Sequence, residues 1–205
     1  RGDWDTTVAI AMEGTRDAAE HEYNFTHMML TYGLAYVAAG RGDEEALRRH
    51  CDAMTAWAGP RRLQLLLAAV DETRVAAAIG RGDFEEAYQQ AVSLTPPGRL
   101  PEYYPHFQRV FLDLVESAVR TGRTVEAQAH VEAGRQARLG AISPHHEIIL
   151  AVAAAVAAED EDAGELYEAA LAVPDASLWA YEYARLRLLY GEWLRRRREY
   201  TASRV

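Results

Sequence analysis

Glycines recur at intervals of 40 residues through the first 122 positions of the chain. They are Gly2, Gly42, Gly82 and Gly122, and the first three stand in Arg-Gly-Asp triplets, whereas the fourth stands in Thr-Gly-Arg. Glycine ends helices well because it adopts a left-handed backbone, and an aspartate after it can cap the next helix. Each glycine therefore predicts the turn of a helical hairpin. A period near 40 residues that contains two helices is typical of a helical solenoid.

Alanines extend the same period beyond the last of these glycines. A small side chain at such a position lets two helices cross at close range. The series is Ala46, Ala87, Ala127, Ala163 and Ala202. In addition, Asp83 and Glu86 have the spacing of a capping box, in which each side chain accepts the backbone N–H of the other residue. We therefore expect the hairpin repeat to continue through the whole chain.

The composition favours helices throughout. Of the 205 residues, 38 are alanine and five are isoleucine, and alanine loses the least free energy on entering a helix. Apolar residues recur at spacings of three and four, and no segment alternates as a strand does. We predict an all-α solenoid of about ten to eleven helices. The predicted helices span about residues 3–14, 18–40, 43–58, 61–80, 83–94, 103–121, 124–139, 144–158, 162–173 and 177–197, with an eleventh that begins near 199.

No linker rich in serine, glycine or proline divides the chain. We therefore expect a single domain over residues 1–205, with a bend near 95–104, where three of the seven prolines lie. The chain begins at Arg1 and not at methionine, and it ends within a helical pattern. This indicates a piece of a longer protein.

All 22 basic residues are arginine, which excludes two kinds of enzyme from this segment. Without lysine there is no Schiff-base chemistry and no phosphate-loop lysine to hold a nucleotide. One cysteine cannot form an internal disulfide, and the longest apolar run, residues 148–158, is about half a membrane span. With no signal peptide and a net charge of −9, we expect a soluble, cytoplasmic protein that contacts neither a membrane nor nucleic acid.

No set of residues has the spacing of a catalytic or metal site. His145 and His146 are adjacent, so on a helix they point about 100° apart and cannot readily share a metal. Cys51 is expected to be a small core residue. We predict no catalytic residue, no metal and no cofactor. An all-helical enzyme, the competing class, needs a closed pocket that holds an acid or a histidine with a shifted pKa.

The segment Gly-Asp-Phe-Glu-Glu-Ala at 82–87 resembles the middle of a tetratricopeptide repeat. The resemblance implies a tetratricopeptide-like right-handed superhelix, although the first helices of the hairpins are longer than the usual 34-residue repeat allows. It also implies that the first helix of each hairpin lines a concave face, which is the binding surface in repeat proteins of this kind.

Three longer phrases, taken in order, resemble the sensor region of the large ATP-binding LuxR-family regulators of actinomycetes. They are GRGDFEEAY at 80–88, DLVESAVRTGR at 113–123 and YARLRLLYGEWLRR at 183–196. Members of that family carry an N-terminal ATPase module, a long tetratricopeptide-like array and a C-terminal helix-turn-helix domain. The resemblance implies that this chain is the middle of such a regulator and transmits a signal to those flanking modules. The alternative is a stand-alone tetratricopeptide adaptor that binds peptides and has no role in transcription.

The implied concave face supplies the candidate binding residues. Polar and aromatic groups on such a face can contact a protein, a peptide or a small-molecule inducer. Projected from the glycine turns, they are Met29, Tyr32, Tyr36, Glu72, Arg109, Glu116 and Arg187. A second interpretation is that Arg109, Glu116 and their neighbours only pair with one another. The residues expected between helices are Leu34, Phe111, Leu114, Leu189 and Trp193, together with the aromatic cluster Tyr103, Tyr104, His106 and Phe107.

Overall fold

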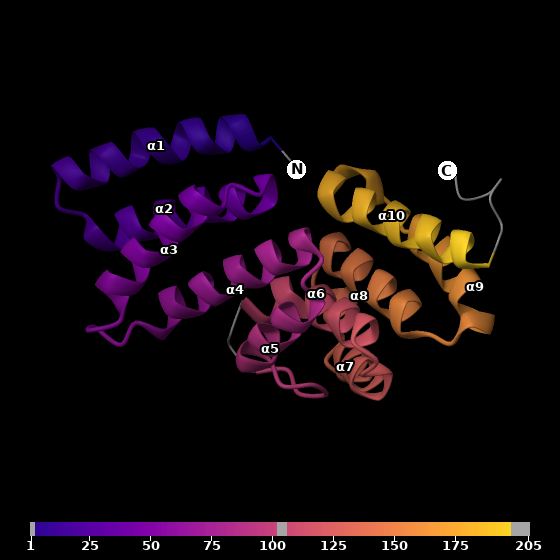
Figure 1. The fold of residues 1–205 in the computed structure, drawn as a ribbon. Coiled ribbons are helices and arrows are strands. Elements are labelled where there is room, and N and C mark those ends of the chain that lie inside the picture. The colour runs from indigo at the N-terminus through magenta and orange to yellow at the C-terminus, as the bar shows by residue number, and fades with distance from the viewer. Residues whose placement is uncertain (1–2, 102–105, 198–205) are drawn as a thin grey trace. The chain divides into compact units, whose positions relative to one another are not determined.

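The computed structural model describes residues 3–101 and 106–197, apart from the side chain of Phe107. Over these residues it contains ten α-helices and two short 3-10 helices, and no strand, which confirms the predicted all-α class (Figure 1). The α-helices are α1 (Trp4–Glu20), α2 (Asn24–Arg41), α3 (Glu44–Ala58), α4 (Gln64–Arg81), α5 (Phe84–Leu94), α6 (His106–Arg120), α7 (Thr124–Gln136), α8 (Pro144–Ala157), α9 (Asp160–Leu171) and α10 (Ala180–Arg196). The predicted eleventh helix and Ala202 lie outside the described residues.

The glycine turns have the predicted geometry. Gly42 and Gly82 adopt left-handed backbones with φ of 69° and 74°, and Gly122 follows with φ of 80°. The residue after each glycine donates its N–H to a carbonyl five residues earlier, as Asp43 does to Ala38 at 3.0 Å. This pattern closes the end of a helix and reverses the chain. The three turns join α2 to α3, α4 to α5 and α6 to α7, so each one connects the two helices of a hairpin.

The aspartates of the repeat cap the helices that follow them. Asp43 accepts the N–H of Ala46 at 2.9 Å, and Asp83 accepts the N–H of Glu86 at 3.1 Å. The reciprocal half of the expected capping box is not made. The N–H of Asp83 is already donated to a carbonyl of the preceding helix, and the Glu86 carboxylate accepts a hydrogen bond from Arg81 at 2.7 Å. The Schellman-type turn therefore replaces the box.

The first two helices differ from the predicted ranges 3–14 and 18–40. Helix α1 continues through Gly14 to Glu20, and the chain turns at residues 21–23, where Glu22 has φ of 58°. Gly14 lies inside α1, at a point where this helix packs closely against α2. A Cβ at this position would lie 2.8 Å from Cδ1 of Leu30 in α2.

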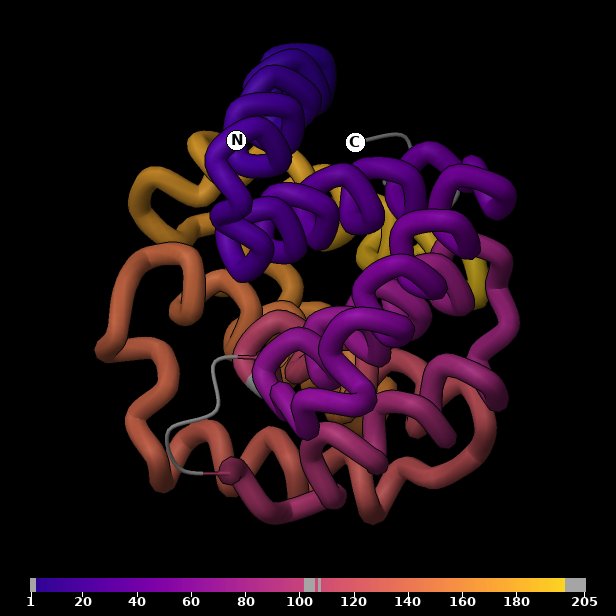
Figure 2. Tube along the Cα trace, turned by 90° about the vertical axis from the view of Figure 1, so that its left-hand side faces the viewer, coloured from indigo at the N-terminus to yellow at the C-terminus, as the bar shows by residue number. Residues whose placement is uncertain are grey.

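The chain forms two compact units. Among the described residues, the N-terminal unit comprises 3–96, 101 and 106–113, and the C-terminal unit comprises 97–100 and 114–197. Within the N-terminal unit, α2 packs against α1, α3 and α4, and α4 packs against α3 and α5. Within the C-terminal unit, α8 packs against α7, α9 and α10. Within each unit, helices that are neighbours in sequence are thus packed together, as expected of a helical solenoid. Figure 2 shows the Cα trace of the chain coloured by residue number.

The cores of both units follow the repeat. Ala87, Ala127 and Ala163 are buried, and so are Phe111, Leu114, Leu189 and Trp193, all of which were expected between helices. Leu34 and Ala46, which belong to the same predictions, are only partly buried and line a groove of the N-terminal unit. No helix among the described residues is long and apolar enough to cross a membrane. The right-handed superhelix, the bend near 95–104 and the single domain stay predictions.

Candidate functional site

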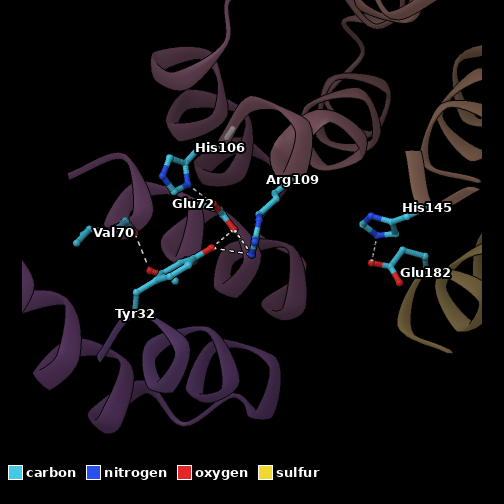
Figure 3. Close-up of polar contacts among 8 residues, drawn as sticks. Tyr32, Val70, Glu72, His106, Arg109, His145 and Glu182 are labelled. Carbon is cyan, nitrogen blue, oxygen red and sulfur yellow. Dashed lines mark hydrogen bonds and ion pairs between the residues drawn. The ribbon is translucent and has the colours of Figure 1, made fainter. Parts of the chain in front are cut away.

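Two of the candidate residues form a hydrogen bond across one full repeat. Tyr32 on α2 donates its hydroxyl to Oε1 of Glu72 on α4 at 2.6 Å, and the two residues are 40 positions apart (Figure 3). They therefore occupy equivalent positions on the first helices of successive hairpins. Both are buried, and the Glu72 residue is only 1% exposed.

The start of α6 adds two more side chains to this pair. Arg109 donates from Nη1 to the Tyr32 hydroxyl at 2.9 Å, and the same nitrogen lies 3.7 Å from Oε1 of Glu72. His106 places its Nδ1 2.5 Å from the other oxygen, Oε2, of Glu72. The polar cluster of Tyr32, Glu72, His106 and Arg109 thus links α2, α4 and the beginning of α6 within the N-terminal unit (Figure 3).

The surroundings fix the protonation of two members of the polar cluster. Burial raises the pKa of Tyr32, and the nearby Glu72 carboxylate raises it further. Burial alone lowers the pKa of Arg109, but Tyr32 and Glu72 outweigh that effect and raise it. Tyr32 therefore remains a hydrogen-bond donor, and Arg109 remains a cation that compensates the buried carboxylate.

Only part of the predicted surface is accessible. The Arg109 side chain is 54% exposed, and its guanidinium lies 5.8 Å from the centre of the Tyr32 ring. Tyr36, which is half-buried, lies one helical turn away with its ring 6.3 Å from that of Tyr32. Met29 is partly buried and packs against the core of the N-terminal unit. Arg109 and Tyr36 are therefore the groups that a partner can reach, whereas Glu72 is buried beside Arg109.

Glu116 has a different role from the predicted one. It is 5% exposed in the C-terminal unit, where its Oε2 accepts hydrogen bonds from Nε and Nη2 of Arg185 at 3.0 and 2.5 Å. Arg120 lies 3.6 Å from its other oxygen. Arg109 and Glu116 do form ion pairs, as the second interpretation expected, but not with each other. Arg109 pairs with Glu72, and Glu116 pairs with Arg185 and Arg120. A buried carboxylate with these contacts is not a surface for a ligand, while Arg187 on α10 is exposed.

One further polar contact in the C-terminal unit was not foreseen. His145 Nε2 lies 2.8 Å from Oε1 of Glu182 (Figure 3). The His145 ring also packs on Trp179, with centroids 4.3 Å apart. Spacing in the sequence gives no sign of this contact, because the partners are 37 residues apart and lie on different helices. In the described ranges, no group of three or more His, Cys, Asp or Glu residues could hold a metal ion.

The remaining predictions on single residues have mixed outcomes. Cys51 is buried in the N-terminal core, with its sulfur 3.4 Å from the Thr73 hydroxyl, as expected. His106 was expected to pack against aromatic rings. Its ring does contact that of Tyr32, but its Nδ1 also lies against the Glu72 carboxylate, so it belongs to the polar cluster. Tyr103, Tyr104 and the side chain of Phe107 lie outside what the structure describes.

The polar cluster can bind a partner through Arg109, with Tyr36 as an accessible neighbour. Both oxygens of Glu72 are engaged by Tyr32 and His106, so this carboxylate is a positioning group for the arginine. A half-exposed guanidinium with a fixed orientation suits a carboxylate, a phosphate or a carbonyl oxygen of a partner. Comparison of the chain with protein-family models, with curated proteins and with solved structures found no match.

Proposed function

We propose that this chain is a non-catalytic interaction and signal-transmitting domain of a LuxR-family transcriptional regulator. The observation that supports it most is the polar cluster, which ties the first helices of three successive hairpins to one half-exposed arginine. A ligand or protein segment that binds Arg109 and Tyr36 acts on three helices at once. Its binding energy therefore depends on how these helices are arranged.

The mechanism needs no bond to be made or broken. A ligand that binds one arrangement of the helices more tightly than another shifts the population toward the first. Flanking modules that contact the ends of the array then respond to that shift. The size of the response is limited by the difference in affinity between the two arrangements.

Arg109→Ala in the full-length protein tests this proposal. The change removes one charge-assisted hydrogen-bond donor, worth about 1.5–3 kcal/mol, which corresponds to a loss of partner affinity of about tenfold or more. We expect the regulator to lose most of its response at its target promoter, measured with a transcriptional reporter in the host. The melting temperature should fall as well, because the change removes the cation beside the buried Glu72 carboxylate. Tyr36→Ala leaves the contacts of Glu72 in place, so it should lose response with little change in melting temperature. Arg135→Ala, on an exposed arginine of α7, is the matched control. A normal response in Arg109→Ala would contradict the proposed role of the cluster.

The competing proposal is a stand-alone peptide-binding adaptor. The polar cluster serves either function, since both need a recognition surface. The sequence that flanks this segment discriminates between them: a phosphate loop upstream and a helix-turn-helix downstream support the regulator. An adaptor has neither, and Arg109→Ala then reduces peptide capture without an effect on transcription.

A further inference from the structure

A second surface of the N-terminal unit lies on the opposite side of α2 from the polar cluster. It is a groove of about 610 Å³ between α1 and α3, and α2 forms its floor with the buried residues Val37 and Ala38. Leu34 also lines it, two positions after Tyr32, which is about 200° around the helix. This apolar groove is thus separate from the candidate functional site.

The apolar groove is built from side chains that leave apolar surface in contact with water. Val8 and Met12 of α1 form one wall, and the Met12 residue is 54% exposed. Small residues, Ala38 of the floor and Ala46 of α3, leave space for the backbone of another segment to approach. Val8, Met12 and Leu34 therefore offer apolar surface that a partner can remove from water.

The next repeat supplies an internal comparison. A groove of about 390 Å³ lies between α3 and α4, the helices that correspond to α1 and α2 one repeat earlier, and we refer to it as the charged groove. Three apolar positions of the first groove are occupied there by charged residues 40 positions later: Val8 by Arg48, Met12 by Asp52 and Leu34 by Arg74. The fold of the repeat therefore does not require apolar residues at these positions, so their presence in the first groove needs another cause.

Arginines surround the apolar groove, although the chain as a whole carries a net charge of −9. Arg16, Arg41 and Arg49 line it against a single acidic residue, Asp43, whose carboxylate already caps α3. Arg41 and Arg49 form ion pairs with acidic residues that are themselves largely exposed. Exposed pairs of this kind are worth little, so an incoming carboxylate can replace either one. The charge of the groove favours an acidic partner.

We propose that the apolar groove binds an acidic amphipathic helix of a partner protein. The lining residues of α2 run from His27 to Arg41, about 21 Å at 1.5 Å per residue, which is the length of about four helical turns. Such a helix places apolar side chains at i, i+3 or i+4, and i+7 into the groove. Asp and Glu on its flanks then face Arg16, Arg41 and Arg49. This inference does not depend on the proposed regulator function, because it rests on different residues.

Three synthetic peptides test the chemistry of the partner. The first is a fluorescein-labelled helix with leucines at i, i+4, i+7 and i+11 and glutamates on the flanks. The second carries lysine in place of each glutamate, and the third keeps the composition but scrambles the leucine positions. With the full chain, we expect fluorescence anisotropy to show at least tenfold tighter binding of the first peptide, and the preference for glutamate over lysine to shrink as salt is added. Equal binding of all three peptides, or no saturable binding of the first, overturns the proposal.

Substitutions taken from the charged groove test the location. Met12→Asp and Leu34→Arg introduce the residues that stand 40 positions later, and each should weaken binding of the acidic peptide at least tenfold. Met12 is an exposed position, so Met12→Asp alone decides the matter if Leu34→Arg lowers the melting temperature. Arg48→Ala in the charged groove should leave the affinity unchanged. Undiminished binding in Met12→Asp overturns the proposal. The fatty acid dodecanoate tests whether the groove holds a free acyl chain, and binding of dodecanoate without binding of the peptide also overturns the proposal.

Discussion

His130 makes the stability of the C-terminal unit sensitive to mild acid. Its side chain on α7 is fully buried, and burial lowers its pKa to about 4. In the unfolded chain a histidine has a pKa of about 6.5. Below pH 6.5 the unfolded state therefore binds a proton that the folded state does not accept. The contribution to stability is complete above pH 6.5 and is lost progressively as the pH falls toward 4.

The magnitude follows from the difference between the two pKa values. About 2.5 units at 1.36 kcal/mol each amount to about 3 kcal/mol of unfolding free energy between pH 7 and pH 4. Carboxylates that are protonated in the same range add their own pH dependence. The His130 contribution is therefore obtained as the difference between the wild-type protein and a variant that cannot titrate at this position.

Urea denaturation at a series of pH values from 7.5 to 4 measures this difference. His130→Leu should be less stable than the wild type at pH 7, because it loses the native packing, but its stability should fall less steeply with acid. His21→Gln, at an exposed histidine, should keep the wild-type slope. Histidine NMR signals give an independent check, since the His130 ring should not titrate above pH 5. Equal slopes in the wild type and His130→Leu would refute the argument from burial.

Two further predictions concern packing and ion pairs. Arg185→Ala leaves the buried Glu116 carboxylate without its main partner and should cost about 3–5 kcal/mol, measured by chemical denaturation, whereas Arg187→Ala should change stability by less than about 0.5 kcal/mol. A similar loss in both variants would contradict the assignment of the pair. Gly14→Ala gains about 0.5–1 kcal/mol of helix propensity but pushes its Cβ against the end of the Leu30 side chain, which must shift, so it should stabilise the protein less than Gly33→Ala, which meets no atom within 4 Å and should stabilise α2 by about 0.5–1 kcal/mol. Equal melting temperatures for the two variants would show that the close approach is not tight.

The features that the sequence predicts well are those set by near neighbours. The glycine turns and aspartate caps involve contacts within five residues, so their geometry follows from the local order of residue types. The 40-residue period also predicts which residues of successive hairpins occupy equivalent positions. It places Tyr32 and Glu72 at equivalent positions, and these two residues are hydrogen-bonded.

The features that the sequence does not predict depend on which helix faces arrive opposite one another. One position along a helix rotates a side chain by about 100°, so a small error in the helical phase exchanges one arginine of α10 for another. The prediction named Arg187, whereas the arginine that contacts Glu116 is Arg185. His106 was assigned to aromatic packing because its carboxylate partner is 34 residues away on another helix. The predicted range 3–14 stops at Gly14, whereas α1 continues to Glu20, because a glycine inside a helix that faces a neighbouring helix has the same local signal as one that ends a helix.

Cys51 gives the protein a chemical reporter that is confined to one of its two units. It is the single cysteine of the chain, it is buried in the N-terminal unit, and burial raises the pKa of its thiol. Cys51 lies at the bottom of the charged groove and is only 2% exposed, so a thiol reagent reaches it when α3 and α4 move apart locally. The rate at which Cys51 is modified under native conditions therefore measures how often this part of the N-terminal unit opens. The C-terminal unit contributes no signal, because it has no cysteine. Local stability in the hairpins can be followed separately from global unfolding, with no added label and no substitution.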